Sequence, residues 1–175
     1  MIRRIFSLFA VALLSACAVT DVNVYKNETP KLDLEKFFIG KTDAWGIFQK
    51  RSGEVVKRFH VEIEGKKLGE ELILDEHFTY SDGSKQQRIW RLKKNAEGNW
   101  NGSADDVKGI ANGELAGNAF KWQYVLILPV DGTNYEMHMN DWMYLIDDNT
   151  LVNRTKMSKF GFEVGEVSIF FRRRL

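Results

Sequence analysis

The chain has 175 residues with 25 basic and 24 acidic side chains, a formal net charge of +1 and 44% hydrophobic residues. This balance excludes binding of nucleic acid through a basic excess, because such a surface must neutralise many phosphates. The length suits one domain with a real core, and two prolines without a low-complexity run argue against extensive disorder.

The N-terminal segment 1–16 has the three-part plan of a signal peptide. Arg3 and Arg4 form a short positive region, and the apolar run 5–14, broken by Ser7, follows it. This run is shorter than the roughly 20 residues that a membrane-spanning helix needs. The pattern therefore predicts a signal peptide over residues 1–16 that is removed from the mature protein.

The sequence Leu14-Ser15-Ala16-Cys17 resembles the lipobox of bacterial lipoproteins, and Cys17 is the sole cysteine of the chain. The resemblance implies that Cys17 receives a diacylglyceryl group and an acyl chain such as palmitate, which together hold a protein on a membrane. Residue 18 is alanine, whereas aspartate at this place tends to retain enteric-type lipoproteins at the inner membrane. We therefore expect a lipid anchor in the bacterial outer membrane, facing the periplasm, rather than in the inner membrane.

Residues 17–31 are polar and without a clear period, which predicts a lipidated N-terminus and tether. A short helix is expected next. Thr29 would cap it, Pro30 would occupy its first position and Gly40 would end it. Residues 32–175 are predicted to form a single β-barrel domain.

Beyond this helix the chain alternates polar and apolar residues with period two, between Gly, Asn and Asp turns. The predicted strands are 44–50, 55–64, 70–80, 85–93, 99–105, 107–112, 118–128, 135–144, 150–157 and 166–173. About ten successive strands predict an all-β, antiparallel up-and-down barrel, because closure removes the edges of a long sheet.

One hairpin can be given a register from its sequence alone. A three-residue loop with Gly83 in the left-handed conformation places Leu74 opposite Trp90 and Glu76 opposite Arg88. A two-residue loop would set apolar residues opposite charged ones, so we prefer the three-residue register. It makes Glu76 and Arg88 a cross-strand ion pair on an otherwise apolar face.

Two further strands differ in how clearly their faces can be assigned. Trp122 and Tyr124 lie on one apolar face of the strand 118–128. In the strand 135–144, alternation does not decide which side faces inward. One side carries Tyr135, Met137, Met139, Asp141 and Met143, and the other carries His138, Asn140, Trp142 and Tyr144.

Eight short motifs follow one another along the predicted barrel. They are Asp75-Glu76-x-Phe78, Asp82-Gly83, Arg88-x-Trp90, Gly117-Asn118-Ala119, Trp122-x-Tyr124, Asp141-Trp142-Met143, Asn153-Arg154 and Lys159-Phe160-Gly161. Their order over residues 32–173 resembles a family of bacterial lipoproteins known as domain of unknown function 3833. The family has no established activity, so the resemblance implies a family without implying a function.

A more distant resemblance concerns the start of the predicted barrel. The run Phe37-Phe38-Ile39-Gly40-Lys41 leading to Trp45 is similar to the opening helix and Gly-x-Trp strand of lipocalins, the calycin barrels. Trp45 lies five residues after Gly40 instead of two. The resemblance implies a lipocalin-like architecture, and a fold by itself does not specify a function.

A barrel of this kind can enclose one small apolar ligand, such as a lipid or fatty acid. The predicted ligand-binding residues are the aromatic Phe78, Trp90, Trp122, Tyr124 and Trp142, with Glu76, Arg88 and Arg154 holding a polar headgroup. The alternative is a barrel filled by its own side chains that serves as an envelope interaction or scaffold protein, with an unknown protein partner. In that case Glu76 and Arg88 form a structural ion pair.

Catalytic and metal sites have little support in the sequence. It contains no Gly-x-Ser-x-Gly, His-Glu-x-x-His or phosphate-binding glycine loop, and its three histidines lack metal-ligand spacing. We therefore predict no enzyme, no metal and no cofactor, although a haem held by a histidine stays an alternative. A further alternative is an enzyme acting on envelope lipids, with Glu76 and Asp141 as an acid/base pair.

A cavity of roughly 300 Å³ or more would favour ligand binding over a filled barrel.

Overall fold

The computed structural model of the chain describes residues 20–130 and 132–174, so the predicted signal peptide and Cys17 lie outside the described residues. Its elements are η1 (Val22–Tyr25), α1 (Leu34–Phe38), β1 (Gly40–Lys50), β2 (Val55–Leu68), β3 (Glu71–Tyr80), β4 (Lys85–Lys94), β5 (Trp100–Ser103), β6 (Val107–Ala116), β7 (Ala119–Val130), β8 (Thr133–Asp147), β9 (Thr150–Lys159) and β10 (Phe162–Arg173). No helix in the described part of the chain has the length and apolar character needed to cross a bilayer.

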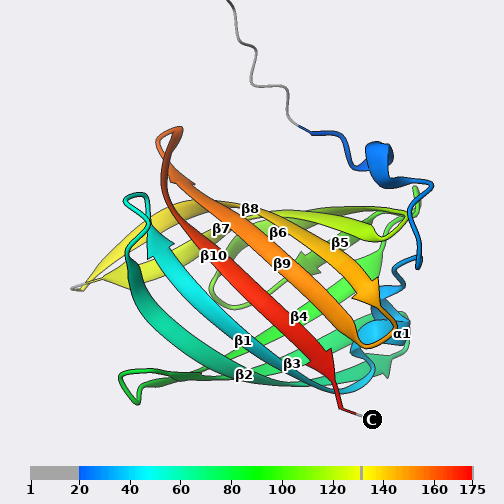
Figure 1. The fold of residues 1–175 in the computed structure, drawn as a ribbon, viewed down its shortest axis with the longest axis horizontal. Helices are drawn as coiled ribbons and strands as arrows, with labels where there is room; N and C mark the ends of the chain where they lie inside the picture. The colour runs from blue at the N-terminus through cyan, green and yellow to red at the C-terminus, as the bar shows by residue number, and fades with distance from the viewer. Residues whose placement is uncertain (1–19, 131, 175) are drawn as a thin grey trace, which may run out of the picture.

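The strands form one closed barrel (Figure 1). Each strand pairs antiparallel with its neighbours in sequence, and β1 pairs with β10 to close the sheet. The prediction of an all-β, up-and-down barrel of about ten strands with one short helix is confirmed. Closure leaves no unpaired edge along the wall, as expected for a meander of this length.

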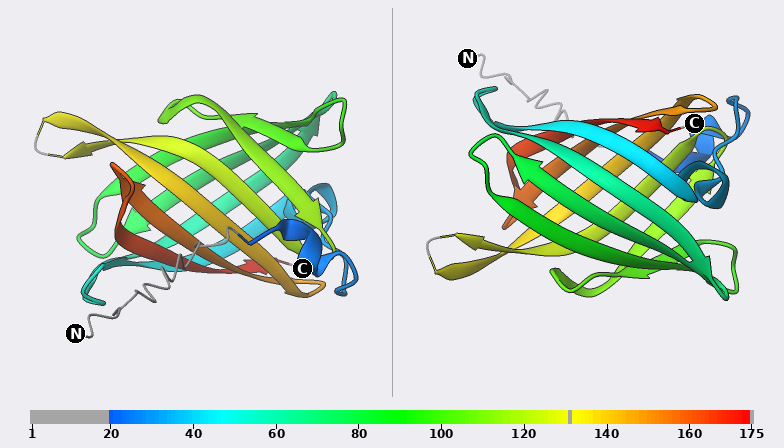
Figure 2. Two further views of the ribbon diagram at one scale, coloured as in Figure 1. Left: turned by 90° about the horizontal axis from the view of Figure 1, so that it is seen from above. Right: turned by 90° about the horizontal axis from the view of Figure 1, so that it is seen from below.

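The two ends of the barrel are built differently (Figures 1 and 2). We call the end at which α1 lies the closed end. The opposite end, which we call the open end, carries the hairpin turns that join β1 to β2, β3 to β4, β7 to β8 and β9 to β10. The helix therefore covers one end of the barrel and the hairpin turns surround the other.

The helix α1 begins at Leu34, so the prediction that it starts at Thr29 and Pro30 is wrong. The N-cap is Asp33, whose carboxylate accepts a hydrogen bond from the backbone N–H of Lys36 at 3.1 Å. This bond satisfies one of the free N–H groups of the first turn, which is why the helix starts here. The preceding chain is extended, and its Leu32 N–H donates to a carbonyl of the β6–β7 turn at 2.8 Å.

The apolar face of α1 closes the barrel. Leu34, Phe37 and Phe38 are each less than 5% exposed. The Phe38 ring meets that of Phe171 from β10 edge-on, with 5.9 Å between centroids. A β-carbon at Gly65 on β2 would overlap the backbone carbonyl of Phe38, so glycine there lets the helix lie directly on the wall.

Part of the predicted tether packs on the outside of the barrel. Val22 in η1 is 3% exposed. The Tyr25 ring lies 5.9 Å from that of Trp142 and 5.4 Å from that of Tyr144, both on β8. Gly117, with φ of +56°, leaves room for the carbonyl of Tyr25. From Val22 onward this segment therefore belongs to the folded domain.

The register predicted for the β3–β4 hairpin is confirmed. Leu74 pairs with Trp90 and Glu76 with Arg88. Gly83 has φ of +81°, the left-handed conformation that the three-residue loop requires. The hairpin therefore directs Glu76 and Arg88 to the inner face.

The orientation of β8, which its sequence leaves open, follows from its pairing with β7. Asp141 is opposite Trp122, and Met139 is opposite Tyr124. Directly paired residues share a face of the sheet, and Trp122 is 3% exposed inside the barrel. Asp141 and Met139 therefore face inward, whereas Trp142 faces outward.

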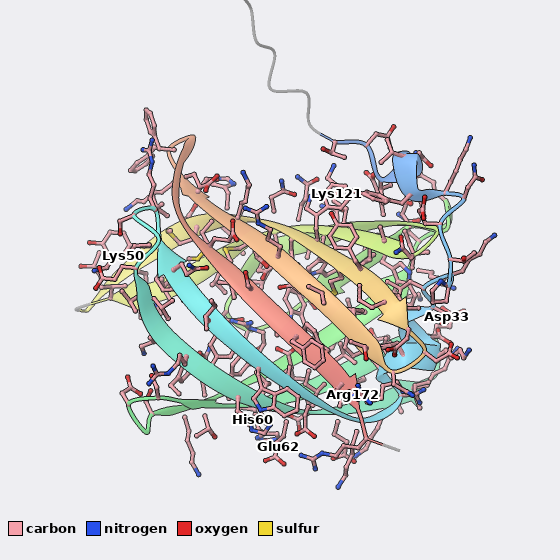
Figure 3. The ribbon with its side chains drawn as sticks, in the orientation of Figure 1. Asp33, Lys50, His60, Glu62, Lys121 and Arg172 are labelled. Atoms are coloured by element: carbon pink, nitrogen blue, oxygen red, sulfur yellow. The ribbon has the colours of Figure 1, made fainter. Side chains whose placement is uncertain are left out.

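Polar and charged side chains such as His60, Glu62 and Arg172 project from the outer surface of the wall (Figure 3). Near the closed end, the guanidinium of Arg174 binds the carboxylate of Asp43 and lies 2.8 Å from Glu62. His60, beside them on β2, hydrogen bonds Asp43 at 3.0 Å. This network fastens the basic C-terminal residues to β1 and β2.

Candidate functional site

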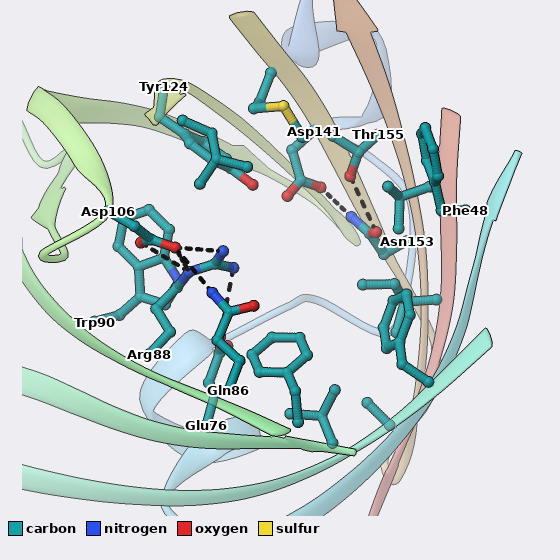
Figure 4. A pocket seen from close by; sticks show the side chains of 18 of the residues that line it. Phe48, Glu76, Gln86, Arg88, Trp90, Asp106, Tyr124, Asp141, Asn153 and Thr155 are labelled. Atoms are coloured by element: carbon teal, nitrogen blue, oxygen red, sulfur yellow. Dashed lines mark hydrogen bonds and ion pairs between the residues drawn. The ribbon is translucent and has the colours of Figure 1, made fainter. Parts of the chain in front are cut away.

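The interior of the barrel contains a cavity of about 940 Å³ (Figure 4). It extends from Phe38 of α1 to Pro129 near the open end, and residues of every strand except β5 and β6 contribute to its lining. The volume lies in the upper part of the range typical of ligand pockets. The interior is therefore not filled by the barrel's own side chains, which favours ligand binding over the filled-barrel alternative.

Most of the predicted ligand-binding residues line this cavity. They are Glu76, Phe78, Arg88, Trp90, Trp122 and Tyr124. All six lie on β3, β4 and β7, the strands whose inward faces the alternation assigned. The structure therefore brings together residues that are up to 48 positions apart in the chain.

The prediction that Trp142 and Arg154 also line the cavity is wrong. The two residues pair across β8 and β9 on the outer face. The side chain of Arg154 is 63% exposed, with Nη2 2.7 Å from Glu166. The sequence of β9 carries a signal for this, because buried Leu151 and Met157 share a face with Asn153 rather than with Arg154.

An aromatic wall forms one side of the cavity. The Trp90 ring meets Trp122 and Tyr124 edge-on, with centroid distances of 5.5 and 5.3 Å. Gly102 and Gly113 on β5 and β6 make room for this wall, because a β-carbon at either position would lie within 2.8 Å of the Trp122 ring. The Trp122 ring can therefore lie directly against the backbone of β5 and β6.

The Arg88 guanidinium is bound mainly by a residue that the sequence interpretation missed. Its Nε donates to both carboxylate oxygens of Asp106 at 3.0 and 2.9 Å, and Nη2 donates to Oδ2 at 2.7 Å. The predicted partner Glu76 is more distant, with 3.9 Å between Nη1 and Oε2. Asp106 lies in the turn before β6, where strand periodicity gives no orientation.

Glu76 is held in a poorly solvated position, since its side chain is 14% exposed. Burial raises its pKa from 4.5 to about 7, because a carboxylate loses hydration there, although the positive charge of Arg88 acts in the opposite direction. The negative charges of Asp106 and Asp141 raise the pKa further. Glu76 can therefore gain or lose a proton near neutral pH.

Asp141 on β8 is a second polar group in the cavity. From the sequence it was predicted only as an acid/base candidate. It is 6% exposed, and its Oδ1 accepts a hydrogen bond from the Asn153 amide. The Asn153 oxygen accepts in turn from the Thr155 hydroxyl at 3.2 Å. Burial raises the pKa of Asp141 to about 7, although the hydrogen bond from Asn153 lowers it.

Glu76, Arg88, Asp106 and Asp141 form a polar band in the cavity, and apolar side chains lie on both sides of it. Toward the closed end the cavity meets Leu74, Leu92 and Phe120. Toward the open end lies a separate cluster that contains the buried Met139 and Met157. Methionine side chains are flexible and polarisable, so they adapt to ligands of irregular shape. The cavity thus offers apolar surfaces around a central polar band.

The polar band continues toward the open end. Tyr80 donates a hydrogen bond to the Gln86 side chain at 2.7 Å, and Gln86 donates to Asp106 at 3.3 Å. At the mouth, Lys57 pairs with Asp82 at 3.2 Å. Within the described ranges, no group of three or more His, Cys, Asp or Glu side chains is arranged to hold a metal ion.

Solved structures similar to this chain share its barrel fold. A protein of unknown function from Nostoc punctiforme, of the DUF3598 family, matches with a TM-score of 0.60 and 11% identity, covering 84% of this chain and 51% of that one. This chain thus spans about half of the Nostoc protein. An S-type phycobiliprotein lyase, CPES from Guillardia theta, matches with a TM-score of 0.58 and 7% identity, covering 90% and 99%. Lobster apocrustacyanin A1 has a TM-score of 0.39, 12% identity and coverage of 81% and 63%.

The Nostoc protein and the lyase share the barrel fold of this chain, in agreement with the predicted lipocalin-like architecture. No curated protein matches the sequence. Residues 11–173 match the family described as protein of unknown function (DUF3833). The chain therefore belongs to this family, as the motifs along the barrel predicted.

Proposed function

We propose that this DUF3833 protein binds an amphipathic, lipid-like small molecule inside its barrel, while a lipid on Cys17 anchors it to the periplasmic face of the outer membrane. The observation that carries the proposal is the cavity of about 940 Å³. Burial of apolar ligand surface contributes roughly 25 cal/mol per Å², so a cavity of this kind favours ligands with long apolar parts.

The distribution of polar groups favours an amphipathic ligand over a purely apolar one. Glu76, Arg88 and Asp141 all face the cavity between apolar surfaces. These side chains are only partly hydrated in the cavity. A ligand without polar atoms would displace the remaining water and leave its hydrogen bonds without a replacement. A ligand with one polar group and apolar parts on either side matches this arrangement.

The proposed anchor would hold the barrel close to the bilayer. Val22, the first buried residue of the described chain, follows Cys17 by five positions. A fully extended chain of that length spans at most about 18 Å. The cavity would then lie near the membrane surface, where lipid-like ligands are concentrated, and this supports a carrier or sensor of membrane amphiphiles.

Native mass spectrometry of the full-length protein, purified from its own envelope, tests the binding proposal. We expect an added mass that disappears after organic extraction and is weakened in Trp90→Ala. Trp142→Ala is the matched control, because this tryptophan lies on the outer face. An apo mass under gentle conditions, or equal loss in Trp90→Ala and Trp142→Ala, would contradict binding in the cavity.

The anchor has a separate test. Replacing Cys17 by Ser should move the protein from the membrane fraction to the soluble periplasmic fraction, because the acceptor of the lipid is lost. Unchanged fractionation with the outer membrane would contradict lipidation at this residue, and fractionation with the inner membrane would contradict the proposed location.

A second candidate function is acid–base catalysis on a bound amphiphile. The observation that favours it is that Glu76 and Asp141 face one cavity and that the pKa of each lies at about 7, a value suited to proton transfer near neutral pH. Extracted ligand should be chemically unchanged after incubation with the protein if binding is the function. Conversion by the wild type that is lost in Glu76→Gln would favour the enzyme.

A further inference from the structure

The three cations and three acids that line the cavity are unevenly placed. In the polar band, Arg88 is surrounded by Glu76, Asp106 and Asp141. The lining residues Lys57 and Lys85 are near the hairpin turns of the open end. A ligand that reaches the polar band therefore meets more negative than positive charge.

Carboxyl groups of the protein already surround the Arg88 guanidinium. Its Nε and Nη2 atoms are bound to Asp106, and Nη1 lies 3.9 Å from Glu76. A ligand carboxylate at this place would compete with Asp106 and Glu76 for the guanidinium, and it would lie beside carboxyl groups that repel it. Separating a buried charge pair in this way leaves an uncompensated charge in a poorly solvated site, which is strongly unfavourable.

The same arrangement suits a cation. Asp141 is 6% exposed, and one of its oxygens is bound to Asn153 while the other is directed into the open part of the cavity (Figure 4). Tyr124 and Trp90 present aromatic rings beside this space. Aromatic faces attract cations, and a carboxylate in the same site adds a direct charge interaction.

We propose that the cavity selects amphiphiles with a positively charged ammonium head, held between Asp141 and Glu76 against the rings of Trp90 and Tyr124. The ligand's apolar tail lies along the methionine-rich part of the cavity toward the open end. This inference rests on the proposed binding function and names the ligand class of the same site. Fatty acids, which bring a further carboxylate, are discriminated against.

The test compares three probes that share one apolar chain: dodecyltrimethylammonium, dodecanol and dodecanoate. The two charged probes are titrated below their micelle concentrations, and dodecanol below its solubility limit, into the full-length protein at pH 8. Binding is followed by calorimetry and by tryptophan fluorescence. We expect the ammonium probe to bind about tenfold or more tightly than the alcohol, and dodecanoate to bind most weakly.

The variants Asp141→Asn and Glu76→Gln keep the shape of the side chains and remove the charge. Each should lower the preference for the ammonium probe over the alcohol by about tenfold and leave the affinity for the alcohol nearly unchanged. Asp75→Asn is the matched control, because Asp75 precedes Glu76 on β3 and pairs on the outer face with His77 at 3.1 Å. The relative affinities of the three probes for the wild-type protein test the selectivity by themselves. The proposal therefore stays testable even if a variant fails to fold.

The possible outcomes distinguish a failure of the ammonium selectivity from a failure of the proposed binding function. Binding of dodecanoate as tight as that of the ammonium probe, or equal affinities for all three, would overturn the ammonium selectivity and leave the binding function standing. Failure of all three probes to bind would contradict the proposed function and the inference together.

Discussion

The closed and open ends of the barrel use similar residues in opposite ways. At the closed end the ring of Phe38 is 4% exposed and packs against Phe171. At the open end Phe160 and Phe162, which flank the turn between β9 and β10, are 86% and 70% exposed. An aromatic residue therefore stabilises this fold only where a second element covers it, and α1 supplies that cover at one end alone.

The contrast extends to the interior. Leu72 and Leu151, near the closed end, are completely buried. Toward the open end the wall is lined by methionines around the cavity. We infer that the closed end provides the stability that allows the rest of the interior to remain available for a ligand. Substitutions at the two ends should therefore differ in their effect on unfolding.

The largest expected difference comes from one substitution made at both ends. Phe38→Ala should lower the free energy of unfolding by about 3–5 kcal/mol, because it leaves a cavity under the helix. Phe160→Ala should change it by less than about 0.5 kcal/mol, because the ring is exposed. Urea denaturation of both variants measures the difference, and equal losses would show that the closed end does not carry the stability.

The pH dependence of stability probes the cavity itself. The pKa of Glu76 is raised from 4.5 to about 7 in the fold, so the native state keeps a proton that the unfolded state releases between these values. The free energy of unfolding therefore contains a contribution that is present below pH 4.5 and lost as the pH rises through 7. Glu76→Gln should remove about 3–4 kcal/mol of this decline, at about 1.4 kcal/mol per pKa unit.

The groups that surround the Glu76 carboxyl enter this prediction too. Arg88 lowers its pKa, whereas Asp106, Asp141 and Asp75 raise it. Urea denaturation of the wild type and of Glu76→Gln is measured at a series of pH values. The difference between the two proteins separates the contribution of Glu76 from that of the surrounding charged residues. Parallel curves for the two proteins would contradict the raised pKa.

A smaller effect is expected where α1 meets the wall. Gly65→Ala places a β-carbon against the carbonyl of Phe38, so the helix must shift away from β2. We expect a loss of about 1–3 kcal/mol in the free energy of unfolding. Lys66→Ala is the neighbouring control, because its side chain is 69% exposed. A neutral Gly65→Ala would mean that the helix can close the barrel in more than one position.

The smallest effect concerns the hairpin turn at the open end. Phe160 has φ of +51°, a conformation that asparagine adopts more readily than phenylalanine. Phe160→Asn should therefore leave the free energy of unfolding unchanged or raise it by up to about 1 kcal/mol. Thermal denaturation checks this outcome. A clear loss of stability would show that the exposed ring has a structural role.

Much of the fold could be predicted because it depends on local pattern. The β3–β4 register followed from one turn residue, Gly83, and from matching Leu74 with Trp90. The helix start could not be placed in the same way. Thr29 with Pro30 and Asp33 are both plausible caps in sequence, and packing of Leu34 and Phe38 into the closed end selects Asp33.

The candidate site was predicted in part for the same reason. Six of the proposed residues face the cavity because their strands alternate clearly. Trp142 was ambiguous because both faces of β8 carry apolar and polar residues. Asp106 was missed because it lies in a turn, and its contact with Arg88 depends on how the β5–β6 turn folds over the mouth of the cavity.

The sequence by itself determined the number of strands, their antiparallel order and the inward faces of β3, β4 and β7, because alternation and turn chemistry act over a few residues. Tertiary structure decided the orientation of β8, the pairing of Arg88 with Asp106 and the size of the cavity. These depend on barrel closure, which brings distant strands to opposite sides of one space and sets how much of it their side chains fill.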